Sequence, residues 1–223
     1  SQIDSPLAGY IPVLGVYGTG WLLALLPALL LAMLKNQQRL ISMALLVAVL
    51  VAGLLLDRVQ WSTPRGEAIQ VSLVQGNISQ EDKWAPENLL STFSRYTDLT
   101  FGAQVSDLTI WPETAIPAFH DQVNDGFIAY LETELQKNGV SLLTGIPVLD
   151  RQHWEYYNAV ITLGGEQAFY YKQHLVPYGE YLPLRWLIGN ALDALAVPNA
   201  DFSSGTDSQP LLLAAGYPVA TSI

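Results

Sequence analysis

The sequence contains no cysteine, and it has only 10 lysine and arginine residues against 20 acidic ones. Without cysteine the 223 residues can form no disulfide and contain no thiol nucleophile. The formal net charge of −10 argues against nucleic acid as a partner, because nucleic-acid binding needs a basic surface. It argues equally against electrostatic attachment to anionic lipid, so any contact with a lipid bilayer would have to be apolar.

Charged residues are also missing from two long stretches near the N-terminus. None occurs over residues 5–34 or over residues 40–56, and a helix that crosses a bilayer needs about 20 apolar residues, with a range of roughly 17–25. We therefore predict two transmembrane helices within residues 10–57. The short loop 35–39 between them contains two positive charges, which places it on the cytoplasmic side by the positive-inside rule. A buried hairpin of a soluble protein is the alternative, and a signal peptide would need a basic start that this sequence lacks.

The rest of the chain divides into a segment before these helices and two segments after them. Residues 1–9 form a loop that precedes the first helix, and residues 58–68 are predicted to be a linker. Residues 69–223 have the composition of a globular domain. By the same charge rule, both outer ends of the helical pair, and hence this domain, lie on the side opposite the cytoplasm.

Periodicity within residues 69–223 predicts alternating strands and helices. Apolar–polar alternation and short apolar runs predict strands, and apolar residues at helical spacing predict helices. Adjacent glycines at 164 and 165 predict a tight hairpin. The predicted strands cover 69–75, 108–111, 140–144, 158–163, 167–172, 211–213 and 218–223, and the predicted helices run from Pro86 past Leu99 and over 123–137. This order favours an α/β or α+β layered sandwich.

Three charged residues stand where a site could form. Glu113 directly follows a predicted strand, Lys172 follows an aromatic run, and Glu180 is next to a glycine that permits close backbone approach. Each also has a plain structural interpretation, as a solvated strand-end glutamate, a lysine with its charge extended to the surface, or an ion-paired loop residue. Local sequence does not choose between these interpretations.

The remaining candidates are weaker. Trp84 follows the first predicted strand and fits either the core or an apolar pocket. His174 invites a general-base assignment, but it has no partner at triad spacing, so we expect a structural, hydrogen-bonded histidine. His120 and His153 are expected at the surface, and no metal-binding pattern is visible.

Several segments together carry a family resemblance. They comprise 74–77 (Val-Gln-Gly-Asn), 83–84 (Lys-Trp), 110–117 (Ile-Trp-Pro-Glu-Thr-Ala-Ile-Pro), 142–146 (Leu-Leu-Thr-Gly-Ile), 157–164 (Tyr-Asn-Ala-Val-Ile-Thr-Leu-Gly) and 172–183 (Lys-Gln-His-Leu-Val-Pro-Tyr-Gly-Glu-Tyr-Leu-Pro). The chain resembles the apolipoprotein N-acyltransferases of Gram-negative bacteria, which are membrane-integrated members of the nitrilase superfamily. The resemblance extends over the whole chain, including the loop at residues 1–9.

This resemblance implies an α/β fold, the nitrilase-like α-β-β-α sandwich, attached to transmembrane helices and incomplete in this chain. It implies a multi-pass inner-membrane enzyme whose domain, from about residue 58, lies in the periplasm. The enzyme transfers an acyl chain from a phospholipid to the α-amino group of a diacylated apolipoprotein. Matched motif by motif, Glu113 is the general base, Lys172 the electrostatic stabiliser and Glu180 a second glutamate beside them, and Trp84 belongs to the active-site region. No cofactor, metal or nucleic acid is implied, and a monomer is the simplest expectation.

One catalytic group of the family is missing from this sequence. The nucleophilic cysteine is expected immediately after Ile223, so we expect the chain to be a C-terminally truncated segment of a longer protein. Two alternatives remain open: a membrane-tethered nitrilase-type amidase, in which water attacks the acyl-enzyme, and a non-catalytic protein that binds lipoprotein or lipid.

Overall fold

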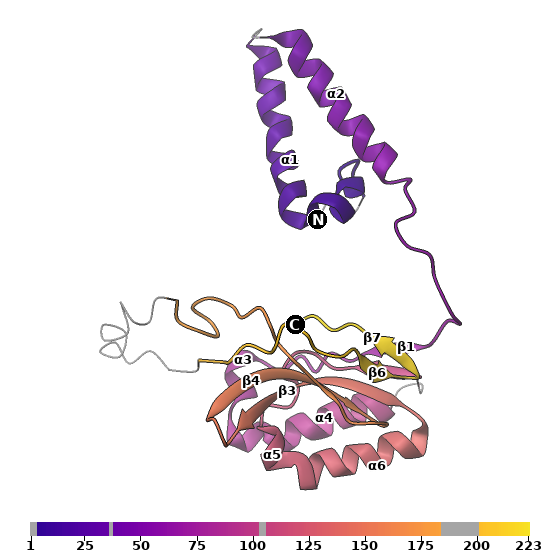
Figure 1. The fold of residues 1–223 in the computed structure, drawn as a ribbon, viewed down its shortest axis with the longest axis vertical. Helices are drawn as coiled ribbons and strands as arrows, with labels where there is room; N and C mark the ends of the chain where they lie inside the picture. Colours follow the sequence, from indigo (N-terminus) through magenta and orange to yellow (C-terminus); the bar gives the residue numbers. More distant parts are fainter. Residues whose placement is uncertain (1–3, 36–37, 103–105, 184–200) are drawn as a thin grey trace. The chain divides into compact units, whose positions relative to one another are not determined.

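The computed structural model describes residues 4–35, 38–102, 106–183 and 201–223. The chain divides into two compact units, Ser1–Glu67 and Ala68–Ile223. The first unit is helical and the second is built around a β-sheet (Figure 1).

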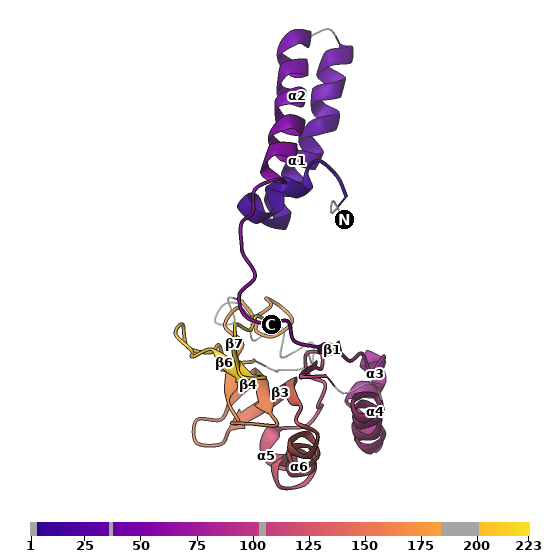
Figure 2. The ribbon, with the colours of Figure 1, turned by 90° about the vertical axis from the view of Figure 1, so that its right-hand side faces the viewer.

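The first unit is a pair of long helices. A short 3-10 turn, η1 (Ala8–Tyr10), leads into α1 (Ile11–Leu34), and α2 (Arg39–Leu56) runs back beside it (Figures 1 and 2). Gly53 lies so close to the turn before α1 that an added Cβ would be 2.0 Å from the Pro6 carbonyl oxygen. The Tyr10 hydroxyl donates a hydrogen bond of 2.8 Å to the carbonyl of Val49. Small residues at a helix contact are typical of packing within a membrane.

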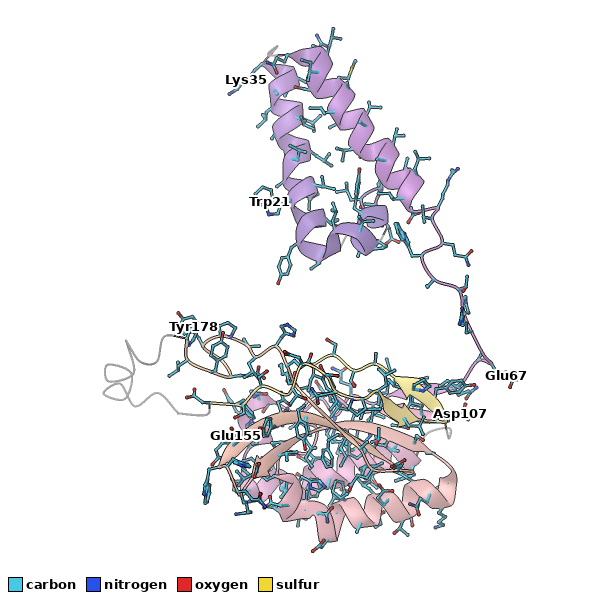
Figure 3. All side chains as sticks on the ribbon, viewed as in Figure 1. Trp21, Lys35, Glu67, Asp107, Glu155 and Tyr178 are labelled. Carbon is cyan, nitrogen blue, oxygen red and sulfur yellow. The ribbon has the colours of Figure 1, made fainter. Side chains whose placement is uncertain are left out.

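The outer surfaces of both helices are apolar. Both are long and apolar enough to cross a membrane, and only 11% of the most apolar window of each is buried. Large apolar side chains project outward along them (Figure 3), including Val16, Trp21, Leu34 and Leu40, which are 72–82% exposed. A buried hairpin of a soluble protein would cover such side chains, so this exposure favours the transmembrane interpretation. Of the predicted connecting loop 35–39, Arg39 begins α2, and residues 36 and 37 lie outside the described part of the chain.

The second unit contains a mixed five-stranded sheet in the order β1–β2–β3–β4–β5. Its strands are β1 (Val71–Leu73), β2 (Leu108–Ile110), β3 (Ser141–Asp150), β4 (Glu155–Leu163) and β5 (Phe169–Tyr171). The first three strands are parallel, and β4 and β5 continue the sheet in antiparallel fashion. A separate hairpin consists of β6 (Leu212–Ala214) and β7 (Tyr217–Val219).

Helices cover one face of the sheet and the β6–β7 hairpin packs on the other. Leu142 and Ile146 of β3 belong to the core beneath the helices, whereas Leu143, on the opposite side of the same strand, packs with Leu212 and Ala214. This alternation follows from the two-residue period of a strand. The described part of the domain therefore has a helix layer, a sheet layer and a second β layer (Figures 1 and 2), in agreement with the expected α/β sandwich.

The helices form because apolar side chains recur at helical spacing. The main helices are α4 (Leu89–Phe101), preceded by η2 (Pro86–Asn88), and α6 (Ala129–Asn138), preceded by α5 (His120–Val123) and a π-helical turn, η3 (Asn124–Ile128). A short helix, α3 (Gln80–Lys83), follows β1. The ring of Phe93 stacks on that of Phe127 with centroids 3.7 Å apart, which joins the two helical segments. The chain leaves α6 at Gly139, whose φ of 68° ends the helix as predicted.

The strand predictions were partly wrong in extent. The predicted 140–144 strand continues to Asp150, where it forms a long hairpin with β4. The extension follows from pairing with β4, since the register runs without interruption from Leu142–Leu163 to Asp150–Glu155. The predicted 218–223 strand ends at Val219.

Candidate active site

Glu113 lies in a tight loop that leaves the end of β2. The loop is anchored on both sides, since Trp111 and Ile116 are 3% and 0% exposed. The amide of Trp111 donates to Leu143 O, and the amide of Ile116 donates to Gly145 O, so the loop is held against β3. An added Cβ on Gly145 would lie 2.7 Å from the Glu113 Cα. The absence of a side chain at position 145 therefore allows β3 to pass directly beneath Glu113.

Lys172 directly follows the end of β5 and lies opposite Asn158, which is within β4. The amide of Lys172 donates a 2.8 Å hydrogen bond to the carbonyl of Asn158, and the amide of Gly205 donates a 2.9 Å bond to Lys172 O. Lys172 is 6% exposed and Asn158 5% exposed. Burial of an ammonium group is costly unless it is paired, so this lysine requires acidic neighbours. Of the two interpretations of Lys172, the structure excludes the surface one.

Two glutamates supply the pairing. Lys172 Nζ lies 2.9 Å from Glu180 Oε1 and 3.2 Å from Glu113 Oε1. Asn158 Nδ2 donates to the same two oxygens, at 3.2 Å to Glu180 and at short distance to Glu113. The reverse amide orientation would turn the Asn158 oxygen toward two carboxyl oxygens, so the donor assignment follows from the neighbours. Two donors and two acceptors thus form one closed cluster.

The two glutamates differ in how many of their carboxyl oxygens accept hydrogen bonds. Glu180 is engaged through both oxygens, because its Oε2 accepts a 2.7 Å hydrogen bond from the amide of Val176. Its side chain is only 14% exposed, whereas that of Glu113 is 49% exposed. Within the described residues, Oε2 of Glu113 accepts no hydrogen bond. Glu113 therefore has an oxygen available for an incoming group, and Glu180 does not.

The cluster also determines the charge of its members. Burial by itself would lower the pKa of Lys172, but hydrogen bonds to Glu180 and Glu113, together with their charges, outweigh it and raise that pKa. Burial would raise the pKa of Glu180, but hydrogen bonds from Lys172, the Val176 amide and Asn158 outweigh it and lower that pKa. At neutral pH the ammonium and the Glu180 carboxylate are consequently both charged.

Trp84, the fourth predicted site residue, is not part of this cluster. It directly follows α3 and is 51% exposed. Its neighbour Lys83 lies closer to the site, since Lys83 Nζ donates a 3.2 Å hydrogen bond to the backbone carbonyl of Glu113. The structure thus brings Glu113, Lys172 and Glu180 together and leaves Trp84 outside their contacts.

The histidine expectations were wrong in two cases. His174 is exposed and makes no hydrogen bond within the described residues, so it is not the structural histidine we expected. His120 is partly buried with its ring edge-on to Phe169, because η3 and α6 pack over the sheet beside it. His153 is exposed and pairs with Asp150.

Asn158 and Lys83 were missed as site residues. Both occur within segments that carry the family resemblance, but neither received a role. An asparagine inside the apolar run of β4 is a usable signal, because buried amides need partners. Lys83 offered no such signal, since a lysine at the end of a short helix is usually solvated.

The family model for carbon-nitrogen hydrolases matches residues 70–187. The chain belongs to the carbon-nitrogen hydrolase family. The match includes every member of the cluster, and it begins at the first strand of the second unit.

Curated relatives extend the similarity to the helical unit. An apolipoprotein N-acyltransferase of Methylococcus capsulatus is 46% identical over 100% of this chain, which covers 45% of that relative. A protein of the same name from Pseudomonas syringae pv. tomato is 39% identical, again over 100% of this chain and 45% of the relative. The chain therefore spans about half the length of the curated relatives it matches.

Solved structures give a more distant likeness. A CN-hydrolase superfamily protein from Xanthomonas campestris is 19% identical with a TM-score of 0.43, covering 67% of this chain and 50% of that one. A carbon-nitrogen hydrolase from Helicobacter pylori is 14% identical with the same TM-score, covering 67% of this chain and 49% of that one.

Proposed function

We propose that this chain is part of a bacterial inner-membrane enzyme that transfers an acyl chain from a phospholipid to the N-terminal α-amino group of a diacylated apolipoprotein. The observation that carries the proposal is the pairing of the buried Lys172 with Glu113 and Glu180, in a chain 46% identical throughout to a protein named apolipoprotein N-acyltransferase. The two apolar helices fit an enzyme whose acyl donor is a membrane lipid. In this proposal the domain from residue 58 onward lies in the periplasm.

We propose that the nucleophile is a cysteine directly after Ile223, as the family resemblance implies; the 223 residues themselves contain none. Glu113 takes the thiol proton, and the thiolate sulfur forms a bond to the ester carbonyl carbon of the donor. The electron pair of the carbonyl moves to oxygen, and the fixed Lys172 ammonium stabilises the resulting oxyanion. When the tetrahedral intermediate collapses, the ester C–O bond breaks and the leaving alkoxide takes the proton from Glu113. A thioester and a lysophospholipid result.

The second half-reaction uses the same groups in reverse. The free amine of the apolipoprotein attacks the thioester carbonyl, and Glu113 accepts a proton from the nitrogen as the C–N bond forms. The C–S bond then breaks, and Glu113 returns the proton to the sulfur. Glu180 and Asn158 do not exchange protons in this scheme, since both Glu180 oxygens accept hydrogen bonds and Asn158 Nδ2 donates to both glutamates. No cofactor takes part.

The proposal is tested by acyl transfer in the protein that carries this chain. The purified protein in neutral detergent is given a phospholipid with a labelled acyl chain and a diacylated lipopeptide with a free N-terminal cysteine. We expect labelled amide product, and a loss of about 10²–10⁴-fold in rate for Glu113→Gln and Lys172→Ala. Each variant should keep the wild-type circular dichroism spectrum. Near-normal transfer by either variant refutes the assigned roles.

The same assay separates the alternatives. Release of free fatty acid from the phospholipid, or of ammonia from a small amide, with no labelled lipopeptide, would indicate an amidase in which water attacks the acyl-enzyme. Lipopeptide binding without turnover, combined with a residue other than cysteine after Ile223, would indicate a binding protein. A peptide mass spectrum across that position, taken after incubation with donor alone, should show a cysteine that has gained one acyl group.

A further inference from the structure

A stretch of chain covers the free edge of the sheet beside Lys172. β5 is the last strand in the order of the sheet, and it ends at Tyr171. Residues 202–209, which we call the edge segment, lie along this edge. The amide of Ser203 donates a 2.6 Å hydrogen bond to Tyr156 O in β4, so the edge segment takes the place beside β4 that β5 leaves.

The edge segment contacts the main chain of both members of the Lys172–Glu180 ion pair. The amide of Phe202 donates a 2.8 Å hydrogen bond to Glu180 O, and the amide of Gly205 donates one of 2.9 Å to Lys172 O. An added Cβ on Gly205 would lie 2.4 Å from the carbonyl oxygen of Tyr171, so the missing side chain allows this approach. A short piece of the edge segment therefore joins two main-chain positions that are 8 residues apart.

Gln209 fastens the edge segment to β5 through both polar atoms of its amide. Its Oε1 accepts a 2.8 Å hydrogen bond from the amide of Tyr171, and its Nε2 donates one of 2.8 Å to the carbonyl of the same residue. The Nε2 also donates to Thr206 O at 3.2 Å. The opposite orientation would turn the side-chain oxygen toward two carbonyl oxygens, so the neighbours determine the assignment. One side chain thus supplies the partners that a further strand would give to this edge.

We infer that Gln209 is a positioning residue for the Lys172–Glu180 pair. This inference rests on the proposed function, because it assigns Gln209 an effect on the group that stabilises the oxyanion. A lysine has a long and flexible side chain, so its ammonium is placed accurately only when its main chain and its partners are held. The Gln209 amide fixes the main chain at Tyr171, directly before Lys172, and the edge segment extends that restraint to Glu180.

The test is a double-mutant cycle between Gln209 and Lys172 in the protein that carries this chain. Gln209→Met keeps the length of the side chain and removes its hydrogen bonds to Tyr171 and Thr206. We expect it to lower kcat for acyl transfer by about 10- to 100-fold, as a displacement of up to about 1 Å would. KM should not change, because Lys172 acts on charge that develops in the transition state. In the Lys172→Met background the same change should cost less than about twofold.

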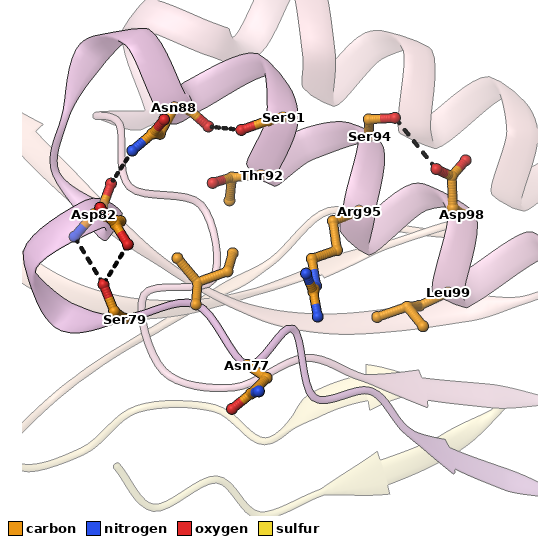
Figure 4. A pocket seen from close by; sticks show the side chains of 11 residues that line it. Asn77, Ser79, Asp82, Asn88, Ser91, Thr92, Ser94, Arg95, Asp98 and Leu99 are labelled. Atoms are coloured by element: carbon orange, nitrogen blue, oxygen red, sulfur yellow. Dashed lines mark hydrogen bonds between the residues drawn. The ribbon is translucent and has the colours of Figure 1, made fainter.

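Two control variants remove side-chain contacts to the main chain elsewhere. Gln122→Met is the matched substitution, since Gln122 Oε1 accepts a 3.2 Å hydrogen bond from the amide of Phe119. Ser91→Ala removes the 2.8 Å hydrogen bond from the Ser91 hydroxyl to Asn88 O, in a hollow beside α4 (Figure 4). Neither side chain is hydrogen-bonded to the cluster within the described part of the chain, so both variants should keep wild-type kcat.

Reductive methylation gives a readout that does not depend on acyl transfer. The Lys172 side chain is 7% exposed and paired with two carboxylates, so it should react slowly in the wild type. The Lys137 side chain is 71% exposed and serves as the internal reference. Gln209→Met, and Gly205→Ala as a second variant of the edge segment, should each raise the methylation rate of Lys172 severalfold and leave that of Lys137 unchanged. Peptide mass spectrometry measures both rates.

Equal losses of kcat in the wild-type and Lys172→Met backgrounds would mean that Gln209 only stabilises the fold, and would overturn the inference. So would wild-type kcat in Gln209→Met, or a methylation rate of Lys172 in that variant equal to the wild-type rate. Absence of acyl transfer by the wild type would refute the proposed function, while the methylation rates would still decide whether Gln209 holds the pair.

Discussion

Replacement of Gly145 by alanine tests how strictly the site depends on the loop that carries Glu113. The added Cβ would lie 2.3 Å from the amide nitrogen of Thr114 and 2.7 Å from the Glu113 Cα. Ordinary contacts of this kind begin near 3.4 Å, so the loop or the strand must move by roughly 1 Å. Both neighbours are backbone atoms, so no side-chain rotation can relieve the overlap.

The size of the effect follows from that displacement. A misplacement of about 1 Å in a catalytic group costs about 10²-fold in rate, which corresponds to about 2.7 kcal/mol of transition-state stabilisation. The Lys172–Glu180 contact does not include the loop, so the cluster loses Glu113 while the remaining pair persists. We therefore expect Gly145→Ala to lower kcat for acyl transfer about a hundredfold and to lower the free energy of unfolding by about 1–3 kcal/mol.

A matched control comes from the same sheet. Gly165, in the β4–β5 turn, has no atom within 4 Å of an added Cβ and no positive φ, so Gly165→Ala should retain wild-type kcat. Transfer rates and thermal unfolding are measured for both variants in parallel. If Gly145→Ala kept more than a third of wild-type activity, the contact between β3 and the Glu113 loop would not be what positions the base.

Four further predictions concern single residues, three of them in the cluster. Glu180→Gln should make the free energy of unfolding depend less on pH in the acid range. A carboxylate with a lowered pKa contributes stability above its ordinary pKa, and that stability is lost as pH falls through the lowered value. Unfolding is followed by circular dichroism at a series of acid pH values, and a pH dependence equal to that of the wild type would contradict the prediction. Lys172 contributes stability that is present below its ordinary pKa and is lost only as pH rises through its raised value. Lys172→Met should therefore remove the decrease in the free energy of unfolding above about pH 10.5. A wild-type free energy of unfolding that does not change in that range would contradict this. Asn158→Asp should lower kcat by about 10- to 100-fold, because a carboxyl group would replace the donor that bridges both glutamates, and activity should recover toward lower pH. His174→Gln changes an exposed position without hydrogen bonds, so its kcat should stay within about twofold of wild type in the same assay.

Composition and local pattern account for the two-part organisation of this chain. Uncharged runs of sufficient length require either lipid or a large buried interface, so the helices at residues 11–34 and 39–56 follow from composition. Periodicity identified α4 and the end of α6 at Gly139, since apolar spacing and a left-handed glycine are local properties. Motif resemblance selected Glu113, Lys172 and Glu180, although local sequence left each of them open.

The contacts that those residues make with one another come from segments that are brought together by folding. Lys172 could have been a surface lysine until pairing of β4 with β5 placed it opposite Asn158, beneath two glutamates that are 59 and 8 residues away. The extension of β3 past Gly145 depends on its pairing with β4, which no local propensity encodes. The unequal engagement of Glu113 and Glu180 is likewise a property of the assembled cluster, because exposure and hydrogen bonding are shared among segments distant in sequence.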